Sequence, residues 1–128
     1  MRTFLIVAIA LLVFSFKIAN KITEVSWYGP RFHGKTTANG EKYNQNDFTC
    51  ASPTLPFNTK IKVTNISNDK FVIVRVNDRG PYKMDKTGKT LKPLIPHPTR
   101  SLDLSKASFE KIANINEGIV KVTIKIIE

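Results

Sequence analysis

The strongest strand signal in the chain is Phe71-Val72-Ile73-Val74-Arg75, which is followed within a few residues by the breaker Gly80-Pro81. β-Branched and aromatic residues favour extended structure, and a Gly-Pro pair ends it abruptly. Asp78 should therefore project from a turn that a rigid strand holds in place, and binding and catalytic groups tend to occupy such positions. The alternative is a structural role, in which Asp78 caps the turn and pairs with Arg79.

The N-terminus has the pattern of a secretory signal. Arg2 supplies a positive charge, and the apolar run at 4–16 is shorter than the roughly 20 residues that a bilayer-spanning helix needs. We predict a signal peptide at 1–19 and a single domain at 20–128, exported to the periplasm, the cell envelope or the extracellular space. An uncleaved anchor is the alternative.

Charge and cysteine content limit the possible partners. The net charge is +10, and +8 remains without Arg2 and Lys17, which suits an anionic polymer such as a bacterial cell wall. An exported chain without a basic helix or an RNA-binding aromatic motif is not expected to bind nucleic acid. Scattered lysines that only maintain solubility are the alternative. We expect a monomer that makes no membrane contact beyond the signal segment.

The few cysteine and histidine residues argue against a metal site. Cys50 is the only cysteine, so no intramolecular disulfide can form, and its small apolar neighbours predict a buried, inert thiol. His33 and His97 are far apart in the sequence and show no metal-ligand spacing. We therefore predict neither a metal nor another cofactor.

Short strand patterns separated by turn signals fill most of the mature chain. Alternating residues predict strands at 24–28, 60–65, 70–77 and 119–127, with the second and third forming a hairpin. One helix is predicted at 105–113, capped by Ser105. The segments 32–46 and 83–99 should be surface loops, the second of them beside the site. This pattern indicates an all-β domain, most simply a small closed barrel.

Six short motifs follow one another along the chain: Ser26-Trp27-Tyr28-Gly29, Gly40-Glu41, Thr54-Leu55-Pro56-Phe57, Val63-Thr64-Asn65, Asn77-Asp78-Arg79-Gly80-Pro81 and Leu102-Asp103-Leu104-Ser105. With these motifs the chain resembles the rare lipoprotein A family of double-psi β-barrel domains. It is more distantly similar to expansins and to the catalytic domain of family 45 glycoside hydrolases. The resemblance implies a six-stranded double-psi β-barrel with one short helix.

Active members of this family are lytic transglycosylases. They cleave the β-1,4 bond of peptide-stripped peptidoglycan strands and leave 1,6-anhydromuramoyl ends. The resemblance implies that Glu41 and Asp78 are the catalytic carboxylates, and cleavage of a glycosidic bond needs such a pair. Asp78 is the candidate for proton transfer and Glu41 its partner, but the roles could be reversed, because pairing with Arg79 would lower the pKa of Asp78.

Further residues complete the predicted site. Ser52, Arg79 and Asp103 are expected to support the carboxylates, and the residues expected to bind the glycan are Trp27, Tyr28, Tyr43, Asn77 and Tyr82. Aromatic rings offer flat apolar faces to sugar rings, although half-buried aromatic residues also serve as core.

One position departs from the family pattern. Ser52 stands where the family commonly has a histidine, and a serine forms hydrogen bonds but carries no charge near neutral pH. A non-catalytic, expansin-like protein that binds cell-wall glycan is therefore the alternative to an enzyme. A protein inhibitor or host-directed effector is a third reading of the same fold.

Overall fold

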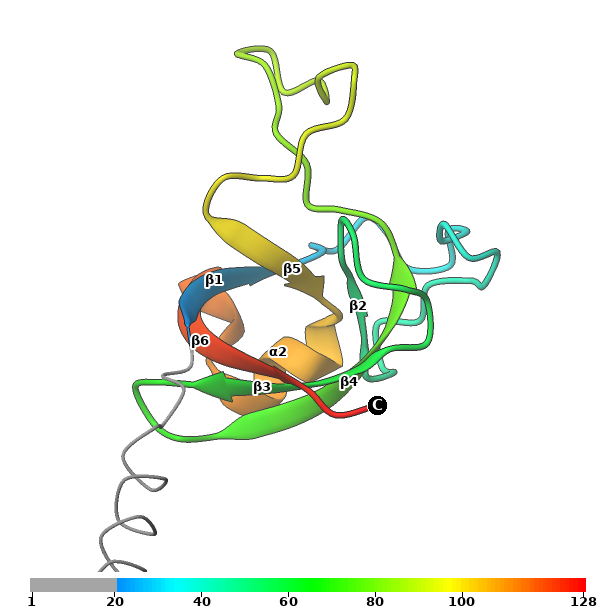
Figure 1. The fold of residues 1–128 in the computed structure, drawn as a ribbon. Coiled ribbons are helices and arrows are strands. Elements are labelled where there is room, and N and C mark those ends of the chain that lie inside the picture. Colours follow the sequence, from blue (N-terminus) through cyan, green and yellow to red (C-terminus); the bar gives the residue numbers. More distant parts are fainter. Residues whose placement is uncertain (1–20) are drawn as a thin grey trace, which may run out of the picture.

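The computed structural model describes residues 21–128, so the predicted signal peptide at 1–19 lies outside the described residues. Within this range six strands close into a barrel in the order β1-β5-β2-β4-β3-β6 (Figure 1). No helix within the range is long and apolar enough to cross a membrane. The elements are β1 (Ile22–Trp27), β2 (Thr49–Ala51), β3 (Lys60–Asn65), β4 (Phe71–Asp78), β5 (Arg100–Leu104), the helix α2 (Lys106–Ile112), the 3₁₀ turn η1 (Ile115–Glu117) and β6 (Ile119–Ile126).

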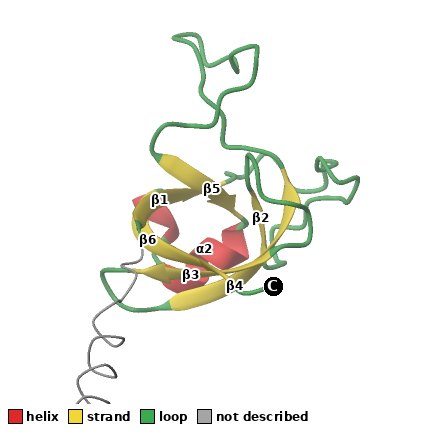
Figure 2. Cartoon of the chain, in the orientation of Figure 1, coloured by secondary structure: helices red, strands yellow, loops and turns green. Residues whose placement is uncertain are grey.

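The strand pairing combines parallel and antiparallel ladders. β1 pairs with β5 and β2 pairs with β4 in parallel, whereas the other four neighbouring pairs are antiparallel. Parallel neighbours need long crossover connections, and here the crossovers include the loops that project from the barrel in Figure 2. The long segment between β4 and β5 is one of these projecting loops. The end of β4 is therefore also the start of a large loop.

A shift of register marks the end of β4. Cys50 lies opposite Val76, but the next residue, Ala51, lies opposite Asp78, so the ladder skips Asn77. Such a bulge re-aims the following side chain. Gly80 then adopts a φ of 124°, which residues with side chains rarely adopt, and the chain turns away. Together the bulge and the glycine present Asp78 at the barrel rim.

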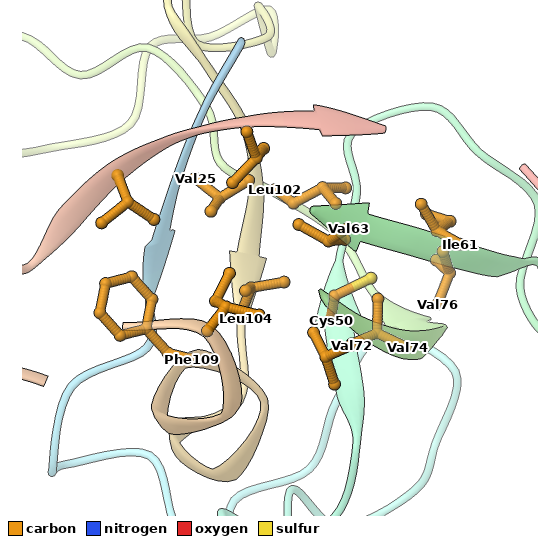
Figure 3. Close-up of a cluster of buried hydrophobic side chains, with 13 residues drawn as sticks. Val25, Cys50, Ile61, Val63, Val72, Val74, Val76, Leu102, Leu104 and Phe109 are labelled. Carbon is orange, nitrogen blue, oxygen red and sulfur yellow. The ribbon is translucent and has the colours of Figure 1, made fainter. Parts of the chain in front are cut away.

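The core is built from the inward-facing residues of the strands. In Figure 3 the buried side chains of Val25, Leu104 and Val76 converge from three strands, and Phe109 points into the same cluster from α2. Phe109 is fully buried, and truncating such a ring to alanine costs about 3–5 kcal/mol. Cys50 also lies in this cluster, and burial raises the pKa of its thiol to about 12, so the predicted inert thiol is confirmed.

Most of the predicted elements are present. The hairpin of β3 and β4 and the final strand match the sequence pattern, and Ser105 caps α2 by accepting from the backbone N–H of Ser108. The first strand begins two residues earlier than predicted, at Ile22, and it ends at Trp27. β2 and β5 were not predicted as strands. β2 has only three residues, too few to show a period, and both strands form by pairing with neighbouring strands of the barrel wall.

Candidate functional site

A cleft of about 400 Å³ lies at the rim where β4 ends. We call it the Asp78 cleft. Two carboxylates line it, from Asp78 and Asp103, and its other lining residues include the four aromatic residues Trp27, Tyr28, Phe32 and Tyr82. Met84 and Thr90 belong to it as well, so the 83–99 loop lies beside the site as predicted.

A larger cavity of about 940 Å³ lies next to the cleft and shares Arg100 with it. It is bounded by the start of β1 and by two loops that contain Ser52 and His97. Glu24 is the only carboxylate among its lining residues. Because cleavage of a glycosidic bond needs carboxyl groups at the reacting atoms, the smaller cleft is the better candidate for chemistry.

The two aspartates of the cleft belong to one row across the barrel wall. Ala51 of β2 lies opposite Asp78 of β4 on one side and opposite Asp103 of β5 on the other, and Ser26 of β1 follows Asp103. Neighbouring strands are about 4.8 Å apart, so the backbones at Asp78 and Asp103 are about 10 Å apart. Ala51 itself also lines the cleft.

The Asp78 carboxylate accepts three hydrogen bonds. The hydroxyl of Tyr28 donates to Oδ2 at 3.0 Å, while the backbone N–H groups of Ala38 and Arg79 donate to Oδ1 at 2.9 Å and 2.8 Å. Burial and the nearby Asp78 raise the pKa of Tyr28 far above its usual value, so its phenol stays protonated and acts as a donor. The carboxylate is thus fixed in orientation while it lines the cleft.

The side chain of Arg79 does not pair with Asp78. Its Nη1 donates to the carbonyl oxygens of Leu55 at 2.7 Å and Ser52 at 3.2 Å, and the guanidinium lies 4.0 Å from the centroid of the Phe57 ring. The ion pair between Asp78 and Arg79 that the sequence left open as a structural alternative is therefore not formed. The guanidinium points toward the turn at 52–57 and is held there by these contacts. Arg79 therefore contacts Asp78 only through its backbone N–H.

Glu41 forms an ion pair with Arg75. Arg75 Nη1 and Nη2 donate to its two carboxylate oxygens at 2.7 Å and 2.9 Å, and Asn39 Nδ2 donates at 2.8 Å. These hydrogen bonds, that of Arg75 above all, lower the pKa of Glu41 to about 2. Glu41 is therefore ionised at neutral pH. Arg75 was not predicted as a site residue, although the alternation along 71–75 places it on the outward face of its strand.

The loop at 37–41 connects the two acidic positions. Ala38 donates to Asp78, Asn39 donates through its side chain to Glu41, and the backbone N–H of Asn39 donates to the carbonyl of Asn77 at 3.3 Å. Glu41 is nevertheless not among the residues that line the Asp78 cleft. The structure therefore brings Glu41 next to the site through a shared loop, whereas Asp78 and Asp103 share the cleft itself.

Asp103 is held by its neighbours on β1 and β5. The Ser26 hydroxyl donates to Asp103 Oδ1, and Arg100 Nη1 lies 3.4 Å from the same oxygen. Arg100 Nη1 also donates to Ser26 Oγ at 2.6 Å. This triad adds a cation to the cleft, and neither Arg100 nor Ser26 was predicted as a site residue.

Three predicted site residues lie behind the cleft instead of lining it. Tyr43 is 2% exposed and its ring stacks on Tyr28 with 4.3 Å between centroids. Asn77 is also 2% exposed, and its Nδ2 lies 3.4 Å from Glu41. The Ser52 hydroxyl accepts from the backbone N–H of Leu55 at 3.1 Å and that of Thr54 at 3.4 Å. All three support residues or turns around the site.

The family model and the curated relatives that match this chain indicate the same family. Residues 21–124 match the family model for lytic transglycolase. The chain is 47% identical over 102 residues to the endolytic peptidoglycan transglycosylase RlpA of Campylobacter jejuni subsp. jejuni, which covers 80% of this chain and 32% of that protein. It is 45% identical over 100 residues to the RlpA of Neisseria meningitidis serogroup A, covering 78% of this chain and 36% of that protein. The chain spans about a third of the length of these curated relatives.

A solved structure confirms the predicted fold. The apo expansin of Clavibacter michiganensis has a TM-score of 0.58 with this chain at 18% identity, over 86% of this chain and 51% of that chain. At this identity the likeness concerns the fold alone. The described residues form the expected six-stranded double-psi β-barrel with one short α-helix.

Proposed function

The chain belongs to the RlpA-like lytic transglycolase family of double-psi β-barrel domains, and from this membership we propose that it is an endolytic peptidoglycan transglycosylase. Its substrate would be a peptide-stripped glycan strand, and its product a 1,6-anhydromuramoyl end. The observation that carries the proposal is the Asp78 carboxylate, which is held by three donors at the rim of an aromatic-lined cleft.

Asp78 serves in both proton transfers of the reaction. In its protonated form it donates a proton to the glycosidic oxygen as the bond from that oxygen to the muramoyl C1 breaks. The resulting carboxylate then accepts the proton of the muramoyl C6 hydroxyl while that oxygen bonds to C1. No water is consumed, and Asp78 ends protonated as it began.

Glu41 is the partner carboxylate. Its pKa of about 2 keeps it ionised during the reaction, and its side chain is 41% exposed next to the site. Through Asn39 it fixes the loop that offers the Ala38 N–H to Asp78. We assign proton transfer to Asp78 rather than to Glu41 because Asp78 lines the cleft, whereas Arg75 holds Glu41 outside it.

The remaining cleft residues bind the glycan. Trp27, Tyr28 and Tyr82 offer ring faces to the sugars, since aromatic rings combine large apolar area with low flexibility. Arg100 lines the same cleft and would meet the lactyl carboxylate that remains when a stem peptide is removed. A cation at this position favours such strands over neutral polysaccharides.

A second function is favoured by Ser52. Its hydroxyl is buried and bound to the turn at 52–55, so it supplies no titratable group where the family commonly has a histidine. A protein that binds wall glycan without cleaving it is the corresponding alternative. Both functions share the cleft, the exported location in the cell envelope and a monomeric state.

A peptidoglycan digest separates the two functions. Purified protein is incubated with peptide-stripped glycan strands, and anhydro ends are counted by mass spectrometry. Wild type and Asp69→Asn should release them, whereas Asp78→Asn should not. Asp69 is a matched control because it is exposed and adopts a φ of 60°, where asparagine is well tolerated. Wild-type protein that cosediments with the glycan but releases no anhydro ends would establish the binding protein instead.

A further inference from the structure

The outward face of three neighbouring strands carries an unusual arrangement of lysines. Lys62 of β3 lies directly opposite Lys125 of β6, and on its other side it lies opposite Ile73 of β4. In the next row Thr64 lies between Phe71 of β4 and Thr123 of β6. Figure 1 shows β4, β3 and β6 side by side. We call this surface the lysine face; its residues are Lys62, Thr64, Phe71, Ile73, Thr123 and Lys125.

The central lysine pair works against the stability of the fold. Like charges directly opposite each other on neighbouring strands are unfavourable. Lys60 at the margin pairs with Glu128 at 3.2 Å, but none of the ion pairs formed within residues 21–128 involves Lys62 or Lys125. The Lys62 ammonium instead lies 4.3 Å from the centroid of the Phe71 ring. Within residues 21–128 no carboxylate forms an ion pair with these two ammonium groups, so their charge can interact with an anionic partner.

Two large apolar side chains accompany the lysines. Phe71 is 52% exposed and Ile73 is 45% exposed, and both lie on the outward face of β4 in the closed barrel. Lysines beside exposed apolar side chains form the kind of surface that lies on an anionic membrane, where the charges meet phosphates and the apolar groups enter the interface. A wall polysaccharide is a poorer match, because neither of the two cavities described above is lined by Lys62, Lys125, Phe71 or Ile73.

We propose that the lysine face docks the domain on an anionic lipid bilayer. Lys62 and Lys125 contact headgroup phosphates, and Phe71 and Ile73 enter the interfacial layer. This contact differs from the sequence-based expectation that the chain meets no membrane outside the signal segment. Phe71 begins β4 and Asp78 ends it, so the lysine face and the Asp78 cleft lie toward opposite ends of this strand. The cleft is lined by none of the residues of the lysine face, so docking would leave it free.

Vesicle binding tests the proposal with the full chain. Binding to vesicles of phosphatidylglycerol and phosphatidylcholine is compared for wild type, Lys62→Glu/Lys125→Glu and Lys86→Glu/Lys89→Glu. The last variant makes the same change of net charge on the exposed 83–91 loop, and the N-terminal segment is common to all three. The first variant should bind at least about tenfold more weakly and the control within twofold of wild type. Equal binding of the two variants overturns the proposal.

A second comparison distinguishes a bilayer from a polymer. Phe71→Ser/Ile73→Thr should weaken vesicle binding and leave binding to soluble polyphosphate unchanged. If Lys62→Glu/Lys125→Glu weakens sedimentation with peptidoglycan but not with vesicles, the face binds a wall polymer and the lipid proposal fails. Both double variants should still release anhydro ends from soluble glycan at the wild-type rate. That readout also confirms folding and keeps the outcome separate from the proposed reaction.

Discussion

Asp78 and Asp103 lie on opposite sides of Ala51 in one row across three strands, and both line the same cleft. The register therefore pairs Asp78 with Asp103 inside the cleft, whereas Glu41 lies outside it on Arg75. Each carboxylate has a different set of donors. Substitutions that remove one charge or one donor at a time can separate their roles.

The charge of Asp103 should matter less than that of Asp78. Asp103→Asn keeps an oxygen for the Ser26 hydroxyl but loses the ion pair with Arg100. Since this aspartate holds Arg100 in place, we expect the rate of anhydro-end formation to fall by about tenfold, with a larger loss for Asp78→Asn. Mass spectrometry of timed digests gives both rates. Equal losses would mean that Asp103 takes part directly in proton transfer.

The hydroxyl of Tyr28 should affect turnover more than binding. Tyr28→Phe removes one of three donors to Asp78 but leaves the ring that stacks on Tyr43. A hydrogen bond to a charged group contributes about 1.5–3 kcal/mol, so kcat should fall by about 10- to 100-fold with little change in KM. The matched control is Tyr82→Phe, which should leave kcat close to wild type. A change confined to KM would contradict a role in orienting Asp78.

Glu41 should make stability depend on pH in acid. Its folded-state pKa of about 2 lies below the ordinary value of 4.5, so its stabilising effect is complete above about pH 4.5 and disappears as the pH falls towards 2. Because the side chain is 41% exposed, solvent screening limits the effect to about 1 kcal/mol or less. Urea unfolding should show Glu41→Gln less stable than wild type at pH 7, with most of the difference lost near pH 2. A difference at pH 2 as large as that at pH 7 would point to packing instead of charge.

Arg79 should stabilise the turn at 52–57. Arg79→Lys retains the charge but loses the planar group that spans the two carbonyl oxygens and the Phe57 ring. We expect the free energy of unfolding to fall by about 1–3 kcal/mol, measured by urea denaturation. Arg31→Lys on the exposed 30–35 loop is a suitable control and should be neutral. A neutral Arg79→Lys would show that the ammonium replaces these contacts.

Ser52 should be structural. Ser52→Ala removes the acceptor for two backbone N–H groups in the turn, which should lower the free energy of unfolding by about 1 kcal/mol. The rate of anhydro-end formation per folded molecule should not change, because Ser52 does not line the Asp78 cleft. Urea unfolding and a digest of the same preparation measure the two effects. A loss of rate without a loss of stability would assign the hydroxyl to the reaction.

Local patterns were sufficient for much of the fold. The alternation along 60–65 and 71–76, the capped helix after Ser105 and the abrupt stop at Gly80-Pro81 depend on neighbours in the chain, and these elements form where predicted. The burial of Cys50 was predictable for the same reason. The motif around Asp78 also indicated correctly that this carboxylate stands at the end of a strand and lines a cleft.

Other features were decided only by tertiary structure. β2 is too short to carry a pattern, and both β2 and β5 form because parallel partners distant in sequence pair with them. The same pairing aligns Asp78 with Asp103 and, through a bulge that skips Asn77, sets the direction of the Asp78 side chain. The sequence left open whether the adjacent Arg79 pairs with Asp78. In the structure the Arg79 guanidinium donates to a turn 24–27 residues away, and Arg75 binds Glu41 across 34 residues. Strand patterns arise from local backbone preferences, whereas the partner of a charged side chain depends on which distant segments the closed barrel places within its reach.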